Sequence, residues 1–406
     1  MKILCVLGEH NYGDPSRGEG YEYVNFLPAL RNLGHQVVFF ESFNRNSYSD
    51  FADLNRKFLE KVQVEVPDII LCVLLGYEIW IETLQLVREG TNAIIINWST
   101  DDSWKYEQFS RFIAPCFHLY ATTYQNALTK SKQDGHGNFF LTQWAANSDK
   151  LAEPLPAALC RYSVSFIGTY YGNRPQWISA LSERGIEVEC FGHGWENGPV
   201  SADKIPKIMR NSVVSLNFGD SGIVMQGIIP GKSRQIKARV FEVPGAGGFL
   251  MTEYAEGLDL CYRIGEEIEV FDGISDITKK IAYFIEHPNE RDSLAMAGHL
   301  RTRNEHTYEM RFEKLFDHAI KHQMTMIDGK SGIDFEKFTL VENSHRAGAG
   351  LKLIKILLMI PCVIIWGRGR GPRAARRLLF ELSWRIVGNK TYAAAGWPGR
   401  LFYKES

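Results

Sequence analysis

Short apolar runs alternate with segments of helical periodicity along most of this chain, and this alternation restricts the fold more than any other feature. Five runs in the first third have the length and composition of strands: 2–8, 36–41, 67–75, 92–100 and 118–123. Between the first two runs, apolar side chains recur at helical spacing from Tyr23 to Leu30, and Gly34 is placed to end that helix. Strands that alternate with helices predict a doubly wound α/β fold, in which a parallel sheet is covered on both faces.

A second series of the same kind begins after residue 160. Its expected strands are 162–168, 186–192, 213–219 and 248–253, and its expected helices are 174–185, 204–212, 238–247, 276–286 and 290–303. The stretch 148–160 has the proline and small residues of a linker. We therefore expect a first domain over 1–150, a second over 160–320 and a tail over 345–406, with ligands bound at the carboxyl ends of the strands and in a cleft between the two halves.

Composition excludes some partners. With 45% apolar residues, 23% charged residues and a formal net charge of −1, the chain has no electrostatic footprint for nucleic acid. The seven cysteines are scattered singly, which favours buried free thiols in a reducing compartment over disulfides. The first residues form an apolar run too short for a signal sequence, so a cytoplasmic location is expected.

Several common cofactor and catalytic motifs are missing from the sequence. The glycine fingerprint of nicotinamide-binding domains is absent from both halves, and the glycines of residues 8–20 have the wrong spacing for it. No phosphate-binding GxxxxGK[ST] loop, GxSxG nucleophile turn or HExxH zinc motif occurs either. No cofactor and no metal ion are therefore expected.

The stretch RVFEVPGAGGFLMTE, 239–253, offers chemistry that fits a nucleotide. Glu242 lies in the first turn of an expected helix, where its carboxylate is placed to accept both hydroxyls of a ribose. The preceding stretch 230–239 is expected to be a flexible basic loop that holds a diphosphate through Lys232, Arg234, Lys237 and Arg239. Small residues such as Gly247 let backbone approach the ligand closely. The alternative is that Glu242 only favours its helix N-terminus and that the loop is a solvated surface.

The block 237–316, which begins KARVFEVPGAGGFLMTEYAEGL, resembles the C-terminal half of the CgeB-like (spore-maturation type) glycosyltransferases. NWSTDDSW (97–104), QWAAN (143–147), VSFIGTYYGNRPQWISAL (164–181) and FGHGW (191–195) also match that family's style. The resemblance implies a GT-B fold of two Rossmann-like domains, and a hexosyltransferase that is metal-independent and retaining. It also implies a nucleotide-diphosphate sugar as donor, bound mainly by the second domain, with Glu242 on the donor ribose. A cell-surface glycan or lipid-linked saccharide is the implied acceptor.

One position departs from the allied group-1 glycosyltransferases. Arg234 stands eight residues before Glu242, where those enzymes carry a first glutamate, and a cation cannot copy the hydrogen bonds of a carboxylate. Either the basic loop binds the diphosphate instead, or the chain is a GT-B glycan-binding or scaffold protein without turnover.

Three further donor-side residues follow from the resemblance. Arg174 resembles the cation that these enzymes direct at the leaving diphosphate, with an exposed turn arginine as the alternative. His193 and Trp195 lie at a strand end, where they are expected to line the base pocket, unless they are ordinary strand-end side chains.

On the acceptor side, Asp101 and Asp102 follow the strand 92–100, where the family's acceptor residues lie. Adjacent carboxylates repel, so one pKa should rise toward that of a general base, although helix capping is an alternative role. His10, in the loop 9–20, is a further catalytic candidate. His306 belongs to the family pattern, with a structural cap favoured as its role.

The tail contains an apolar run, 351–366, interrupted by Lys352, Lys355 and Pro361 and followed by a series of arginines. The run is too short and too charged for a confident transmembrane helix. We expect residues 351–377 to lie on an anionic membrane surface at the inner face of the cytoplasmic membrane. The alternative is a basic amphipathic helix that packs on the C-terminal domain.

Overall fold

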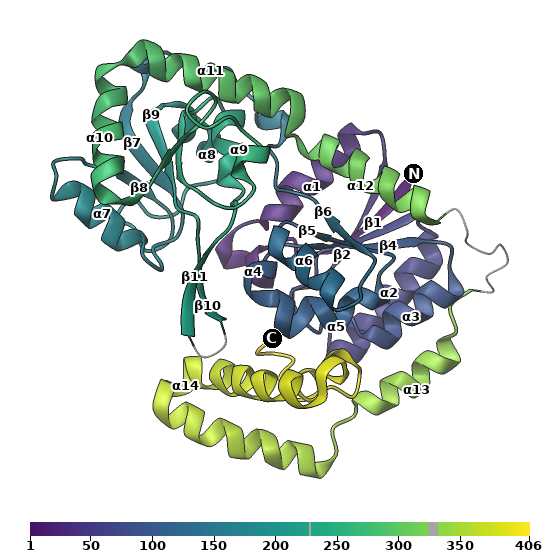
Figure 1. Cartoon of the computed structure of the whole chain (residues 1–406). Helices are drawn as coiled ribbons and strands as arrows, with labels where there is room; N and C mark the ends of the chain where they lie inside the picture. The colour runs from purple at the N-terminus through teal and green to yellow at the C-terminus, as the bar shows by residue number, and fades with distance from the viewer. Residues whose placement is uncertain (227–228, 324–331) are drawn as a thin grey trace. The chain divides into compact units, whose positions relative to one another are not determined.

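The computed structural model describes residues 1–226, 229–323 and 332–406, with backbone alone for 221–226, 229–233 and 323. The chain forms two compact units, which we call unit 1 and unit 2 (Figure 1). Unit 1 contains Met1–Thr122, Ala127–Leu141 and Leu315–Ser406. Unit 2 contains Thr123–Asn126 and Thr142–Lys314. The C-terminal segment therefore belongs to the N-terminal unit and does not stand apart as a tail.

Unit 1 is built on a parallel sheet of six strands in the order β2-β1-β3-β4-β5-β6. The strands are β1 (Lys2–Leu7), β2 (Gln36–Glu41), β3 (Ile69–Cys72), β4 (Ile94–Ser99), β5 (Leu119–Thr122) and β6 (Phe139–Leu141). The central strands β1 and β3 are buried almost throughout, as expected for apolar runs covered on both faces. All five strands expected in this part of the chain are present.

The helices of unit 1 are α1 (Tyr21–Asn32), α2 (Phe51–Glu65), α3 (Ile81–Gly90), α4 (Asp102–Lys105), α5 (Arg111–Ile113), α6 (Gln125–Gln133), α13 (Phe335–His345), α14 (Ala349–Val387) and α15 (Trp397–Leu401). Two of them, α1 and α2, contact the sheet through aromatic side chains. Phe26 of α1 packs on Trp98 of β4 with ring centroids 5.0 Å apart, and Phe58 of α2 packs on Phe40 of β2 at 5.6 Å. The first of these contacts fixes the helical face that the periodicity from Tyr23 to Leu30 predicts.

The long helix α14 is broken at Gly367, where φ is 75° and the chain turns back on itself (Figure 1). A Cβ at Gly371 would lie 2.6 Å from the Cα of Val363, so glycine is needed for the two halves of α14 to pack this closely. Cys362 of the first half packs with Ala375 and Leu379 of the second. We call this pair of antiparallel segments the α14 hairpin.

The end of the chain is fastened to unit 1. The Tyr392 hydroxyl donates to the carbonyl of Gln108, and the Tyr403 hydroxyl donates to the carbonyl of Tyr48 at 3.1 Å. The Tyr403 ring also packs on Phe51 with centroids 4.9 Å apart. The C-terminal segment thus belongs to the N-terminal unit and not, as the alternative expected, to the C-terminal domain, because the aromatic residues that follow α14 contact α2, the stretch before it and the π-helical segment Tyr106–Ser110.

Unit 2 has its own parallel sheet, in the order β13-β12-β9-β7-β8. The strands are β7 (Tyr162–Ile167), β8 (Glu189–Phe191), β9 (Ser212–Asn217), β12 (Leu250–Glu253) and β13 (Glu269–Phe271). The helices are α7 (Arg174–Ser182), α8 (Lys204–Arg210), α9 (Arg239–Gly245), α10 (Gly273–Glu286), α11 (Pro288–Glu305) and α12 (Tyr308–Gln323), of which α12 ends in unit 1. Its core contains Phe166, Leu216 and Met251 from three adjacent strands.

An antiparallel hairpin precedes α9. It pairs β10 (Asp220–Gln226) with β11 (Ile229–Arg234), and Asp220 stands opposite Arg234. The flexible basic loop expected over 230–239 is therefore extended strand as far as Arg234. Ile223, Val224 and Ile229 are β-branched and favour this extended backbone. The loop was predicted from the basic residues alone, so this strand signal was missed.

Candidate functional site

Glu242 lies in the first turn of α9, as predicted, and is held there by Arg239. An Arg239 Nη1 donates to the Glu242 carboxylate, and the Arg239 Nε donates to the carbonyl of Ile167 at 3.1 Å. Ile167 is the last residue of β7, so this contact places Arg239 and Glu242 at the carboxyl end of the unit 2 sheet. The Glu242 side chain keeps 16% of its surface exposed, so it is not fully closed off from solvent.

Arg174 opens α7 and lies near Arg239. Its Nη1 donates to the carbonyl of Thr169 at 2.9 Å, and its guanidinium stacks on Tyr171 at 4.9 Å. Burial lowers the pKa of Arg174, the Tyr171 hydroxyl opposes that shift, and the charge of Arg239 lowers it further. The charges of Arg174 and Arg239 therefore act on one another, and Arg239 in turn contacts Glu242, which suits a diphosphate next to a ribose. We call Arg174, Arg239 and Glu242 the α9 cluster.

Arg234, which departs from the expected glutamate, is paired with a carboxylate that the sequence did not single out. Its Nη2 lies 3.2 Å from Oε1 of Glu253, and Glu253 also accepts from the backbone N–H of Gly219 at 2.9 Å. Glu253 ends β12, and its side chain is only 3% exposed. The sequence feature that could have identified Glu253 is its position at the end of the strand GFLMTE.

The remaining donor-side candidates lie around these residues in different ways. The side chain of Lys232 lies outside the described residues, and Lys237 stands in the turn that leads into α9. Gly247 has φ of 81°, and a Cβ there would lie 2.5 Å from the carbonyl oxygen of Ala152. Its glycine is therefore required by contact with the segment that precedes unit 2's first strand, independently of any ligand.

His193 and Trp195 fix the loop that follows β7. The Trp195 Nε1 donates to the carbonyl of Gly168 at 2.8 Å, and its ring packs edge-on against Phe166 and Tyr170. The backbone carbonyl of His193 accepts from Tyr170 at 2.8 Å, while the His193 side chain is exposed. Of the two, only His193 presents an exposed ring that can meet a nucleotide base.

In unit 1 the two adjacent aspartates have different environments. Asp102 is 1% exposed and accepts from the hydroxyls of Ser99, at 2.7 Å, and Ser110. Burial raises the pKa of Asp102, and these hydroxyls oppose the shift. Asp101 precedes α4 but makes no side-chain cap, and it lines a cavity. The arrangement leaves Asp101 as the member of the pair that meets solvent. His10 is half-buried in the loop after β1, and it is not among the residues that line this cavity.

The cavity in unit 1 has a volume of about 600 Å³. Its walls come from the loops that follow β1, β2, β3 and β4, from the second half of α14 and from the last three residues of the chain. We call it the unit 1 cavity. Of the residues that line this cavity, the sequence analysis identified Asp101 as a site residue. It did not place Arg45, Lys105 and the α14 arginines there, because residues so far apart in sequence meet only after the C-terminal segment folds back.

Glu22 is a further titratable group of unit 1 that sequence reasoning missed. It lies half-buried in the first turn of α1, where a glutamate is ordinary helix chemistry. Burial raises the pKa of Glu22 to about 7, the charge of Asp101 acts in the same direction, and Lys105 opposes it. Glu22 is therefore able to exchange a proton near neutral pH in the neighbourhood of Asp101.

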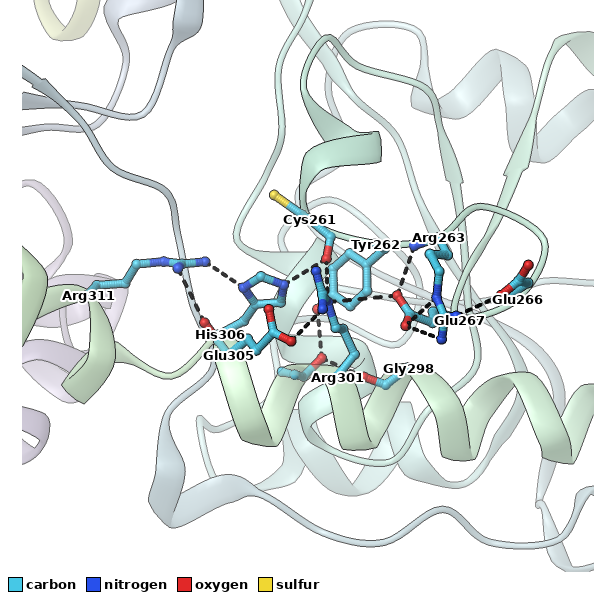
Figure 2. A network of polar contacts seen from close by, with 11 residues as sticks. Cys261, Tyr262, Arg263, Glu266, Glu267, Gly298, Arg301, Glu305, His306 and Arg311 are labelled. Carbon is cyan, nitrogen blue, oxygen red and sulfur yellow. Dashed lines mark hydrogen bonds and ion pairs between the residues drawn. The ribbon is translucent and has the colours of Figure 1, made fainter.

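His306 is a structural residue of unit 2 (Figure 2). Its Nε2 donates to the carbonyl of Cys261 at 2.8 Å, while Arg311 Nη2 donates to Nδ1 at 2.9 Å. Burial and then the charge of Arg311 lower the pKa of His306 to about 4. Both ring nitrogens of neutral His306 are thus hydrogen-bonded. These contacts hold the junction between α11 and α12 in place.

Residues 174–317 match a family model described as glycosyl transferase-like. Among the curated proteins, none matches this sequence. Sucrose-phosphate synthase from Thermosynechococcus elongatus is similar in structure at 11% identity and a TM-score of 0.57, over 79% of this chain and 100% of that one. A glycosyltransferase from Rickettsia africae ESF-5 is similar at 12% identity and a TM-score of 0.55, over 80% of this chain and 99% of that one.

HepE from Anabaena, in complex with UDP, is similar at 12% identity and a TM-score of 0.52, over 79% of this chain and 100% of that one. At these identities the likeness shows the fold. It is the GT-B fold, and the predicted fold class is confirmed.

Proposed function

We propose that this protein is a glycosyltransferase that moves a sugar from a nucleotide-diphosphate sugar to an acceptor hydroxyl. The observation that carries the proposal is the α9 cluster at the carboxyl end of the unit 2 sheet. The cluster lies within the residues that match the glycosyl transferase-like model. In a doubly wound sheet, this is the edge at which ligands bind.

The cluster supplies the groups that donor chemistry needs. Glu242 is placed to accept hydrogen bonds from the two ribose hydroxyls, and Arg174 and Arg239 carry the positive charge that a departing diphosphate requires. Uridine is the first base to test, because HepE structures hold UDP or UDP-glucose. The finer assignment to the CgeB-like subtype rests on the sequence resemblance.

Unit 1 supplies the acceptor side of the proposal. Asp101 faces the unit 1 cavity, and Glu22 can take a proton near neutral pH, so these two carboxylates are the candidates to assist the acceptor hydroxyl. Asp102 holds α4 through Ser99 and Ser110. A cell-surface glycan or lipid-linked saccharide remains the proposed acceptor.

We extend the proposal to metal-independent transfer with retention at the anomeric carbon and no organic cofactor. The arginines of the α9 cluster provide cationic charge at the leaving group, and retention rests on the resemblance to the group-1 enzymes. Turnover should persist in EDTA, and restoration by Mg²⁺ of activity lost in EDTA would contradict this part. The anomeric configuration of the product, read by NMR, tests retention.

The α14 hairpin supports a location at the inner face of the cytoplasmic membrane. Among the described residues one helix, within Ala349–Tyr392, has the length and composition of a span, with a mean hydropathy of 2.1 and 6% of its most apolar stretch buried. Its first half exposes Leu357 at 61%, Ile364 at 78% and Ile365 at 66%. Because the second half packs on this first half, spanning would disrupt the hairpin core, so we propose a peripheral contact with anionic lipid. Sedimentation with vesicles that contain anionic lipid tests it.

A protein that binds glycans without turnover is the second candidate, and Arg234 is the observation that favours it. The ion pair between Arg234 and Glu253 weakens this second candidate. Arg234 stands where the group-1 enzymes carry a glutamate, and Glu253 supplies a carboxylate next to that position. The deciding experiment is calorimetric titration with UDP-, GDP- and ADP-sugars, followed by measurement of nucleotide release. No binding of any sugar nucleotide would overturn the proposed function.

A further inference from the structure

The unit 1 cavity carries an excess of positive charge. Seven cationic and four acidic residues line it. Three of the acids are already engaged by the protein: Asp14 pairs with Arg17 at 3.3 Å, Glu78 accepts from the backbone N–H of Gly76 at 2.7 Å, and Glu405 lies 3.7 Å from Lys355. The fourth, Asp101, forms no ion pair within the described residues.

Four of the cations also have partners within the protein, two of them carboxylates and two of them backbone carbonyls. Arg17 pairs with Asp14, and Arg377 pairs with Glu381 at 2.6 Å. Lys404 donates to the carbonyl of Arg45 at 3.1 Å, and Arg45 donates to the carbonyl of Ser42 at 2.8 Å. These four cations therefore already have partners within the protein.

Three cations remain: Lys105, Arg373 and Arg376. In the described part of the chain, no carboxylate lies within ion-pairing distance of any of them. Lys105 is only 5% exposed, and the Nε of Arg376 is buried without a hydrogen-bond acceptor. A buried charge and a buried donor without acceptors cost free energy, so both fit a site that an anion completes.

We propose that the unit 1 cavity binds a phosphate group carried by the acceptor. Seven cationic against four acidic side chains leave an excess of about three positive charges, enough to balance the charge of about −1.5 to −2 on a phosphate monoester at neutral pH. Arginine forks suit phosphate oxygens, and a volume of about 600 Å³ leaves room for an attached sugar or chain start. The assignment to the acceptor rests on the proposed function; the phosphate site itself does not.

Two sources of this phosphate have the same chemistry: a soluble sugar phosphate and a lipid phosphate. The second half of α14 lines the cavity while the first half exposes its apolar face, so a lipid phosphate would bring its chain to that face. Glucose 1-phosphate is the probe for the soluble source. Dodecyl phosphate, compared with dodecyl maltoside, is the probe for the lipid source.

The test is calorimetric titration of the full-length protein, of Arg373→Gln/Arg376→Gln and of Arg385→Gln. Arg385 is an exposed arginine of the same helix that lies outside the cavity lining, so its variant removes a matched charge. The double variant should weaken binding of glucose 1-phosphate or dodecyl phosphate by about tenfold or more, since each lost charge-assisted hydrogen bond costs about that factor. Arg385→Gln should bind as the native protein does.

Because Arg373 is exposed, Arg373→Gln alone keeps the test valid if the double variant fails to fold. Binding that neither variant weakens, or that Arg385→Gln weakens equally, overturns the proposal, as does the absence of binding by both phosphates. Equal affinity for glucuronate also overturns it in favour of a carboxylate site. Titration with UDP-sugars in parallel separates the outcomes: phosphate binding without donor binding removes the glycosyltransferase function, and the reverse removes only the phosphate site.

Discussion

Arg239 joins Glu242 to the end of β7, since one of its nitrogens donates to the Glu242 carboxylate and another to the carbonyl of Ile167. The contact orients the one acidic side chain of the α9 cluster before a ligand arrives, which reduces the entropy lost on binding. It also means that a donor ribose must share this carboxylate with an arginine already in place.

Glu242→Gln is expected to weaken UDP-sugar binding by about tenfold to a hundredfold, because charge-assisted hydrogen bonds contribute about 1.5–3 kcal/mol. Calorimetry and nucleotide release measure the effect. Glu266→Gln is the matched control, since Glu266 is an exposed carboxylate of unit 2 that pairs with Arg263. Unchanged affinity in Glu242→Gln would remove Glu242 from the donor site.

The Arg239 and Glu242 side chains should be coupled in stability. A double-mutant cycle of Arg239→Gln and Glu242→Gln is expected to give a coupling of about 0.5–3 kcal/mol in the free energy of unfolding, as for residues that share a hydrogen bond. The Arg263 and Glu266 pair is a suitable comparison, because both side chains are more than half exposed and should couple by less than about 1 kcal/mol. Equal coupling in the two pairs would show that Arg239 does not orient Glu242.

Glu22 should make stability fall as pH rises. Its pKa is raised from 4.5 to about 7, so the folded state binds the proton more tightly than the unfolded state, and the stabilisation present below pH 4.5 is lost between pH 4.5 and 7. Glu22→Gln should therefore gain in unfolding temperature relative to the native protein across that window. Thermal unfolding from pH 4.5 to 8 measures this, with exposed Glu19→Gln as the control, and a constant difference would contradict it.

His306 should act in the opposite direction. Its pKa is lowered from 6.5 to about 4, so the unfolded state takes up the proton first and stability is lost as pH falls from 6.5 to 4. His306→Asn should be less stable than the native protein at pH 7, with the gap closing toward pH 4 by up to about 3 kcal/mol. Urea unfolding at several pH values measures the gap, and His287→Asn, at an exposed histidine, is the control. A gap that does not change with pH would rule out a neutral His306.

Local sequence patterns predicted much of this fold, because parallel strands such as β1 and β3 are continuous apolar runs and their helices follow a helical period. The position of Glu242 in the first turn of its helix was predictable for the same reason. The unit 1 cavity was not, since Lys105 and Arg373 are brought together by the break at Gly367 and by aromatic anchors near the C-terminus. The pairing of Arg234 with Glu253 was equally hidden, because it depends on how β11 approaches the end of β12.

The return of residues 315–406 to unit 1 has a consequence for biosynthesis. Tyr392 and Tyr403 contact Tyr48, Phe51 and Gln108, so unit 1 cannot form all of its contacts until residues 392–403 have been synthesised and have left the ribosome. Unit 2 can finish folding earlier, because it lacks these late residues. A nascent chain that stalls before the last helix would thus carry a finished second unit and an open first one.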